Sequence, residues 1–294
     1  MTLGNVTVDG IYVTATNTTT NAGNALQTNN PLTIYGDVTI KNIYGNGNAD
    51  NSNSTAIVVK NSGSTQGKLT VDGKVTIVGN DAGTVNGVTY ERGLYNGILT
   101  QKCPVEIKGD VSIDNTLNQG IYVADDKASF KAQNVTVKNV AKGHGIYVNN
   151  ATGSATVTGN YEADNVHRGL YAVGGTITVN GNATITNPKN NGIEVKGKIT
   201  VGGTASVDMN NVAGKYAIYL NAGTMKATNV VVKNTATTSI YMENSSELDV
   251  VDVTIENSQS QGLLQNFQGI SPCPVKPVHL QGQISNSLSF YSFS

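Results

Sequence analysis

Gly120-Ile121-Tyr122-Val123 is a short stretch of sequence that the chain repeats with variations. The other copies are Gly97-Ile98-Leu99, Gly145-Ile146-Tyr147-Val148, Gly169-Leu170-Tyr171, Gly192-Ile193-Glu194-Val195, Ala217-Ile218-Tyr219-Leu220, Ser239-Ile240-Tyr241-Met242 and Gly262-Leu263-Leu264. Successive copies are 22 to 25 residues apart, counted from the first apolar residue of each. A fixed period of this length indicates a repeat architecture, in which each unit buries its apolar face against its neighbours.

Two shorter patterns lie between successive copies. Each reads apolar, polar, apolar, as in Val105-Glu106-Ile107 and Val111-Ser112-Ile113, which is the period of a β-strand with one buried face. An asparagine follows the second pattern closely in most units. These residues are Asn42, Asn115, Asn139, Asn165, Asn187, Asn234 and Asn257, with Asn80 and Asn210 displaced by one position. Asparagine tolerates left-handed backbone, so these side chains either form a hydrogen-bonded ladder through successive coils or act as independent turn residues.

These patterns predict an all-β fold: a single-stranded right-handed parallel β-helix, or solenoid, of about 9–10 coils, with three strands in each coil. We expect one domain over residues 1–269, with irregular, loop-rich coils in residues 1–100. Two long connections, Tyr44 to Thr55 and Gly79 to Gly93, fall in that irregular part. The repeat stops near Gly269, so we expect residues 270–294 to be a non-repeat tail that caps the last coil or is disordered.

Composition limits the classes of partner. Charged residues are 13% of the chain, against about 25% in an average globular protein. The net charge is −1, which provides no field to attract nucleic acid or an anionic membrane. The cysteines Cys103 and Cys273 have no metal-ligand spacing, and neither a signal peptide nor an apolar run of membrane-spanning length is visible. Repeat-like sequence begins almost at Met1, so we expect this chain to be a fragment of a longer gene product.

The repeated Gly-Ile-Tyr-Val and Val-Thr-Ile strands with their corner asparagines resemble the right-handed parallel β-helix superfamily. Within it they resemble the passenger domains of bacterial autotransporter or adhesin-like surface proteins, over about residues 25–269. The resemblance implies a non-enzymatic rod, secreted or displayed at the cell surface, whose only link to the outer membrane is a barrel segment that this chain lacks. It implies no cofactor and no resident metal.

One polar position in the repeat is a candidate binding surface. The middle residue of each Gly-Ile-Tyr-Val strand points away from the core, and at five levels it is tyrosine: Tyr122, Tyr147, Tyr171, Tyr219 and Tyr241, with Glu194 in the same file. Neighbouring coils lie about 4.8 Å apart, which predicts an exposed aromatic ladder. Such a face would bind a host or matrix glycan or protein. The alternative is that the rings only stabilise adjacent strands.

The runner-up function is a carbohydrate-active β-helix enzyme. Polygalacturonases resemble this chain and use paired aspartates with a Gly-His-Gly, for which Asp125-Asp126 and Gly143-His144-Gly145 are the counterparts here. The other polygalacturonase elements are absent, and pectate-lyase chemistry would rest on the isolated Arg92 and Arg168. His144 and His167 are one coil apart and are expected at the same corner, where two histidines alone make a weak metal site.

Overall fold

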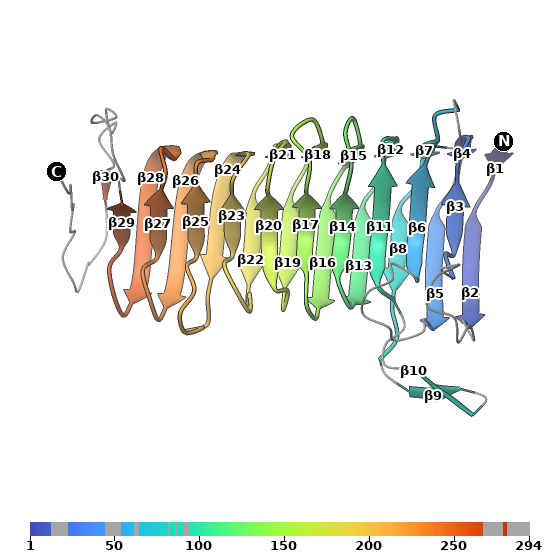
Figure 1. Ribbon diagram of the computed structural model, residues 1–294, viewed down its shortest axis with the longest axis horizontal. Helices are drawn as coiled ribbons and strands as arrows, with labels where there is room; N and C mark the ends of the chain where they lie inside the picture. The colour runs from blue at the N-terminus through green and yellow to red at the C-terminus, as the bar shows by residue number, and fades with distance from the viewer. Residues whose placement is uncertain are drawn as a thin grey trace.

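The computed structural model describes residues 1–12, 23–44, 54–61, 65–81, 83–85, 87–90, 94–266 and 279–280. Every regular element among these residues is a β-strand. The strands stack into a rod with β1 at one end and β29 toward the other (Figure 1). No helix in the described part of the chain is long and apolar enough to span a membrane.

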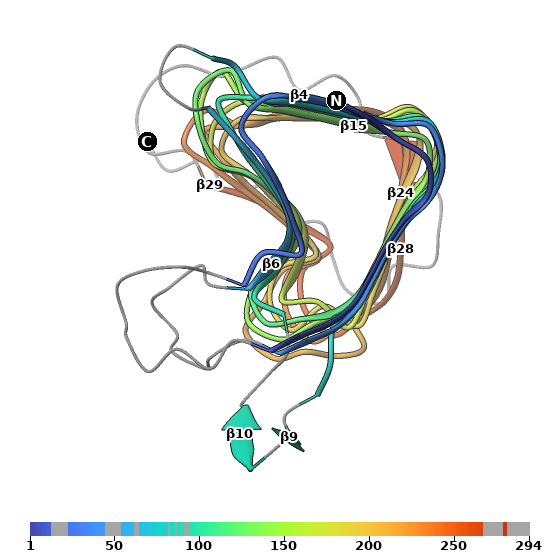
Figure 2. The ribbon, with the colours of Figure 1, turned by 90° about the vertical axis from the view of Figure 1, so that its right-hand side faces the viewer.

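Two parallel sheets form the walls of the rod. Sheet A has 18 strands and sheet B has 10. Seen along the rod, the levels superimpose on one closed outline, and the wall formed by sheet B bows inward (Figure 2). The chain passes through two strands of sheet A and then one strand of sheet B at all but the last three levels, which confirms the predicted parallel β-helix.

The strands of sheet A fall into two columns. The first is β1 (Thr2–Leu3), β4 (Pro31–Ile34), β7 (Lys68–Val71), β12 (Pro104–Ile107), β15 (Ser129–Ala132), β18 (Ser154–Val157) and β21 (Thr176–Val179). The second is β2 (Val6–Tyr12), β5 (Val38–Tyr44), β8 (Val75–Val78), β13 (Val111–Thr116), β16 (Val135–Val140), β19 (Tyr161–Asp164) and β22 (Ala183–Thr186). In the last three levels the two columns merge into single long strands: β24 (Lys198–Asp208), β26 (Thr224–Thr235) and β28 (Glu247–Ser258). The sequence predicted separate strands there, but the chain keeps its pairing around the corner with only a register shift between Val201 and Thr204.

Sheet B contributes one strand at each level. Its members are β3 (Leu26–Thr28), β6 (Thr55–Lys60), β11 (Asn96–Gln101), β14 (Gln119–Val123), β17 (His144–Val148), β20 (Arg168–Ala172), β23 (Ile193–Val195), β25 (Ile218–Asn221), β27 (Ile240–Glu243) and β29 (Leu263–Asn266). About seven turns, from β12 to β29, are regular. The three earlier levels carry longer connections, so the predicted 9–10 coils correspond to the ten strands of sheet B. Right-handedness stays a prediction.

Two features lie outside the regular coils. The connection expected to be a loop from Gly79 to Gly93 contains an antiparallel hairpin of β9 (Gly83–Val85) and β10 (Val88–Tyr90). Within the tail 270–294 only β30 (His279–Leu280) is described, and it pairs in parallel with Asp252 and Val253 of β28. The rest of that tail, including Cys273, lies outside the described residues, as does Arg92. The alternatives of a cap or disorder therefore stay predictions.

The core is a continuous column of apolar side chains from all three strand positions. Ile121 pairs with Ile146 and Ile146 with Leu170, and all three are fully buried. In six of the sheet B strands from β11 to β29, the glycine before the first inward apolar residue makes room for an inward side chain of the second column, whereas Ala217 and Ser239 occupy this position in the other two. A Cβ at Gly120 would lie 2.6 Å from Val137 Cγ1, and one at Gly145 would lie 1.9 Å from the Tyr161 hydroxyl. At Gly120 and Gly145 the glycine is therefore required by the packing.

The corner asparagines form the predicted ladder, but it is mixed with aspartates. All seven in-register asparagines have left-handed backbone, with φ between 52° and 59°. Asn165 donates to Asn139 (2.7 Å) and Asn139 donates to Asp114 (2.8 Å), each in the preceding coil. A second corner has its own ladder, in which the side-chain oxygen of Asn160 accepts the Asn182 backbone N–H (2.9 Å). These bonds satisfy backbone and amide groups where the strands end.

Candidate functional site

The five predicted tyrosines occupy one register position of sheet B. The pairing runs Leu99, Tyr122, Tyr147, Tyr171, Glu194, Tyr219, Tyr241, Leu264, one residue per level. Each of the five tyrosines is half-buried and flanked by buried apolar residues that point into the core. The file therefore lies on the outer face of sheet B, although its rings are less exposed than the sequence predicted.

Three of these residues form what we call the central stack: Tyr122, Tyr147 and Tyr171. The ring centroids are 5.0 Å apart for the first pair and 5.1 Å for the second, and both pairs are within 9° of parallel. Face-to-face packing at this pitch means that each ring covers its neighbour's π-face. The central stack therefore presents ring edges and hydroxyl groups outward, and the Tyr147 hydroxyl donates to Asn149 Oδ1 (2.7 Å).

The other two tyrosines of the file, Tyr219 and Tyr241, form a second group with Tyr216, which we call the distal cluster. The Tyr241 centroid lies 4.7 Å from that of Tyr216 and 5.7 Å from that of Tyr219. The Tyr219 hydroxyl donates to the Glu243 carboxylate and accepts from Asn221 Nδ2 (3.2 Å). Tyr216 was missed in the sequence, although it precedes Tyr219 by three residues as His144 precedes Tyr147. That spacing was an available signal.

Glu194 separates the two aromatic groups. The sequence placed this residue on the solvent side, but its side chain is buried, with only 4% of the residue exposed. Its Oε2 accepts from Arg168 Nε (2.6 Å) and from Asn191 Nδ2 (3.0 Å), and the Arg168 guanidinium lies 5.0 Å from the Tyr171 ring centroid. The carboxylate is tolerated because a charge-assisted pair and an amide compensate its desolvation.

His144 closes one side of the central stack. Its ring is edge-on to both Tyr147 and Tyr171, with centroids 5.0 and 4.9 Å away. The residue is 8% exposed, and its Nδ1 has no hydrogen-bond partner among the described residues. Burial, with smaller contributions from Arg168 and His167, lowers the pKa of His144 to about 3. The imidazole is therefore neutral at physiological pH.

The structure brings His144 and His167 together as predicted, with ring centroids 6.2 Å apart. His167 Nδ1 lies 3.4 Å from Arg168 Nη1 and its Nε2 lies 3.4 Å from Asn190 Nδ2. Within the described ranges, no group of three or more His, Cys, Asp or Glu side chains is placed to hold a metal ion. A guanidinium beside the pair also opposes a bound cation.

The enzyme-like motif does not converge on one place. His144 begins β17 beside Gln119, whose Oε1 accepts the His144 backbone N–H (2.8 Å). Asp125 and Asp126 follow the other end of β14, after Val123. β14 runs for five residues, from Gln119 to Val123, which is about 13 Å of extended strand, and Asp125 lies beyond its end. His144 and the paired carboxylates therefore lie at opposite ends of neighbouring sheet B strands, and the carbohydrate-active enzyme stays a prediction.

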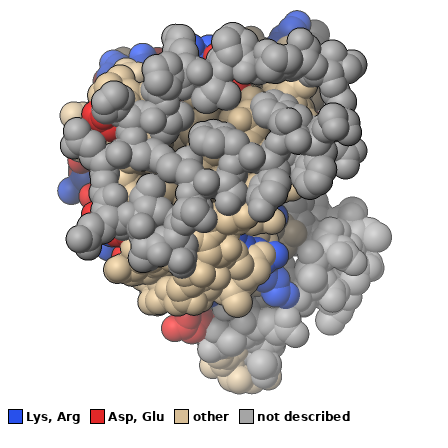
Figure 3. Space-filling model, turned by 90° about the vertical axis from the view of Figure 1, so that its left-hand side faces the viewer, with Lys and Arg blue, Asp and Glu red and all other residues tan. Residues whose placement is uncertain are grey.

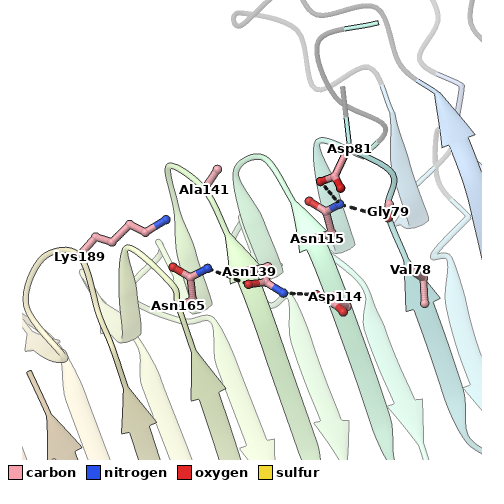
Figure 4. Close-up of a pocket in the computed structure, with 9 residues that line it drawn as sticks. All are labelled: Val78, Gly79, Asp81, Asp114, Asn115, Asn139, Ala141, Asn165 and Lys189. Atoms are coloured by element: carbon pink, nitrogen blue, oxygen red, sulfur yellow. Dashed lines mark hydrogen bonds between the residues drawn. The ribbon is translucent and has the colours of Figure 1, made fainter. Parts of the chain in front are cut away.

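A polar depression of about 480 Å³ lies elsewhere, at the corner that carries the asparagine ladder. Figure 4 shows Asp81 bonded to Asn115, and Asp114 bonded to Asn139, so these four lining side chains already have partners. Charge is also dispersed: basic and acidic side chains both occur on the described surface of the C-terminal end, without one sign dominating (Figure 3). Neither surface competes with the tyrosine file as a binding site.

Comparison with known proteins identifies no relative: no family model, no curated protein and no solved structure matches this chain. The resemblance to autotransporter passengers therefore rests on the repeated strand and corner motifs alone. Any functional assignment has to come from the tyrosine file and its neighbours.

Proposed function

We propose that this chain is a non-enzymatic, adhesin-like rod that binds a glycan or protein along the outer face of sheet B. The observation that carries the proposal is the central stack, in which three half-exposed tyrosines are held in register at 5.0 and 5.1 Å. Rigid aromatic side chains with outward hydroxyl groups bind ligands at low entropic cost. The repeat motif further supports secretion or display at a bacterial surface, as in autotransporter passengers.

The geometry also defines how a ligand would bind. Sugar rings cannot insert between tyrosines that already cover each other's faces, so a ligand contacts the ring edges and hydroxyls from outside. The local charge is balanced, since Arg168 is paired with Glu194 and His144 is neutral. A neutral, hydroxyl-rich ligand fits this surface better than a strongly charged one.

The experiment is a binding screen on an immobilised glycan and matrix-protein panel with the wild type and the double variant Tyr147→Ser, Tyr171→Ser. We expect binding by the wild type and its loss in the double variant, with the fold checked by circular dichroism. Tyr35→Ser is the matched control, because Tyr35 is 64% exposed and lies in sequence after β4 of sheet A. Binding that survives in the double variant would show that the proposal is wrong.

A further inference from the structure

The distal cluster differs from the central stack in the group that accepts the tyrosine hydroxyl. Tyr219 donates to a carboxylate, that of Glu243, whereas Tyr147 donates to an amide oxygen, that of Asn149. Burial, followed by the hydrogen bond to Glu243, raises the pKa of Tyr219. Both tyrosines are therefore phenols at neutral pH, and they differ in whether a base is already in contact with the phenolic proton.

This difference matters when a phenol loses an electron. The phenol radical cation is a strong acid, so one-electron oxidation is easiest where a base takes the proton at the same moment. A carboxylate can accept that proton, whereas a neutral amide is far too weak a base. The Tyr219 hydroxyl therefore has its proton acceptor in place.

A coupling partner is also in place. Tyr241 is paired in register with Tyr219 on the adjacent strand, and the two rings are 16° from parallel with centroids 5.7 Å apart. All three tyrosines of the distal cluster are half-buried, so a small oxidant can reach their edges. The two residues are 22 positions apart in sequence, one coil of the solenoid.

We propose that the Tyr219–Tyr241 pair is a site of oxidative cross-linking, with Glu243 as the proton acceptor. A one-electron oxidant, such as a peroxidase acting with hydrogen peroxide, removes an electron from each phenol. The Tyr219 proton passes to Glu243 and then to water, and the Tyr241 proton is released to solvent. The two radicals join through a carbon–carbon bond between ring positions ortho to the hydroxyls, and each ring then loses that ortho hydrogen as its hydroxyl is restored. In total two tyrosines and one peroxide give one dityrosine and two waters.

The consequence is a covalent bond between two coils near the C-terminal end of the rod. Repeat rods open from their ends, because terminal coils have a neighbour on one side only. A link between β25 and β27 closes a loop of about 20 residues, which stabilises the folded state by restricting the unfolded chain. This role goes beyond ligand binding and does not depend on it.

The test uses the full chain, dilute and monomeric, with tris(bipyridine)ruthenium(II) and persulfate under brief illumination. Cross-linking is read as the loss of two hydrogens by mass spectrometry of the intact monomer and as dityrosine fluorescence. Trypsin releases residues 216–226 as one peptide and cuts after Lys233, ahead of Tyr241. We expect residues 216–226 joined through Tyr219 to the peptide that holds Tyr241. The central stack is the internal reference, because trypsin places its three tyrosines on separate peptides.

Matched variants assign the role of the carboxylate. Glu243→Gln should lower the initial rate of the Tyr219–Tyr241 cross-link severalfold, and Tyr219→Phe should abolish that cross-link. Asn149→Asp places a carboxylate against the Tyr147 hydroxyl and should raise cross-linking within the central stack. The proposal is overturned if the wild type couples the central stack as fast as Tyr219 and Tyr241, if Tyr216 is the joined residue, or if Glu243→Gln leaves the rate unchanged.

Discussion

Replacing Gly145 with alanine is the sharpest test of how the repeat packs. The added Cβ would lie 1.9 Å from the Tyr161 hydroxyl and 2.6 Å from the backbone oxygen of Gly169. Tyr161 cannot swing aside, because it is fully buried and its hydroxyl donates to that same Gly169 oxygen (2.8 Å). The strand of the next coil therefore has to shift.

The magnitude follows from two terms. Overpacking a tight core costs about 1–3 kcal/mol, and disturbing the buried Tyr161 hydrogen bond adds about 1–2 kcal/mol. We expect Gly145→Ala to lower the free energy of unfolding by about 2–5 kcal/mol, measured by urea denaturation. Gly262→Ala is the matched control, because among the described residues the same repeat position in the last level meets only Ile255 Cδ1, at 3.2 Å, and should cost less than about 1 kcal/mol.

A double-mutant cycle separates the two contacts. Tyr161→Phe alone should cost about 1 kcal/mol through the lost hydrogen bond. Combined with Gly145→Ala, it removes the closest clash. The double variant should therefore lose less stability than the sum of the two single losses, by about 1 kcal/mol or more. Strict additivity, or a Gly145→Ala loss no greater than that of the Gly262→Ala control, would refute the packing argument.

Three further predictions concern the polar groups. The folded state excludes the protonated form of His144, whose pKa is about 3 when folded against about 6.5 unfolded. The free energy of unfolding should therefore be at its full value above pH 6.5 and fall toward pH 3 by up to about 4–5 kcal/mol. His144→Gln should reduce this loss at low pH, measured by urea denaturation at several pH values. Asn165→Ala should cost about 2 kcal/mol more than Asn165→Gly in thermal melts, because alanine resists the φ of 53°; equal costs would contradict this. Arg168→Met leaves the Glu194 carboxylate buried and unpaired and should cost about 3–5 kcal/mol, and adding Glu194→Gln should recover most of that loss.

The fold was predictable because equivalent positions in successive coils of a solenoid recur at a nearly constant spacing in the sequence. The spacing of 22 to 25 residues from Ile98 to Leu263 placed eight of the ten sheet B strands correctly. At most levels, the asparagine two positions past the second apolar–polar–apolar pattern marked a corner with left-handed backbone. The merging of strands in β24, β26 and β28 was not predictable, because a corner that keeps its pairing and one that breaks it can have the same short sequence pattern.

The site was predictable only at the level of register. Equal spacing brought Tyr122, Tyr147 and Tyr171 into one file, but periodicity carries no side-chain torsion angles, so it could not show that the rings cover each other's faces. The burial of Glu194 depends on Arg168, 26 residues away, and on Asn191 in the preceding turn. Contacts of this kind depend on which side chains the fold brings together, and they cannot be predicted from the repeat pattern.

The stacked geometry also allows the two roles of the tyrosine file to be told apart. Each stacked pair contributes about 0.5–1.5 kcal/mol through its ring contacts, and those contacts survive when tyrosine becomes phenylalanine. Ligand contact instead depends on the outward hydroxyls and edges, such as the Tyr147 hydroxyl that bonds to Asn149. If the face binds a ligand, Tyr147→Phe should weaken binding while leaving the free energy of unfolding within about 0.5 kcal/mol of wild type. If the rings serve only the fold, Tyr147→Phe should be neutral in both assays and Tyr147→Ser should lower stability alone.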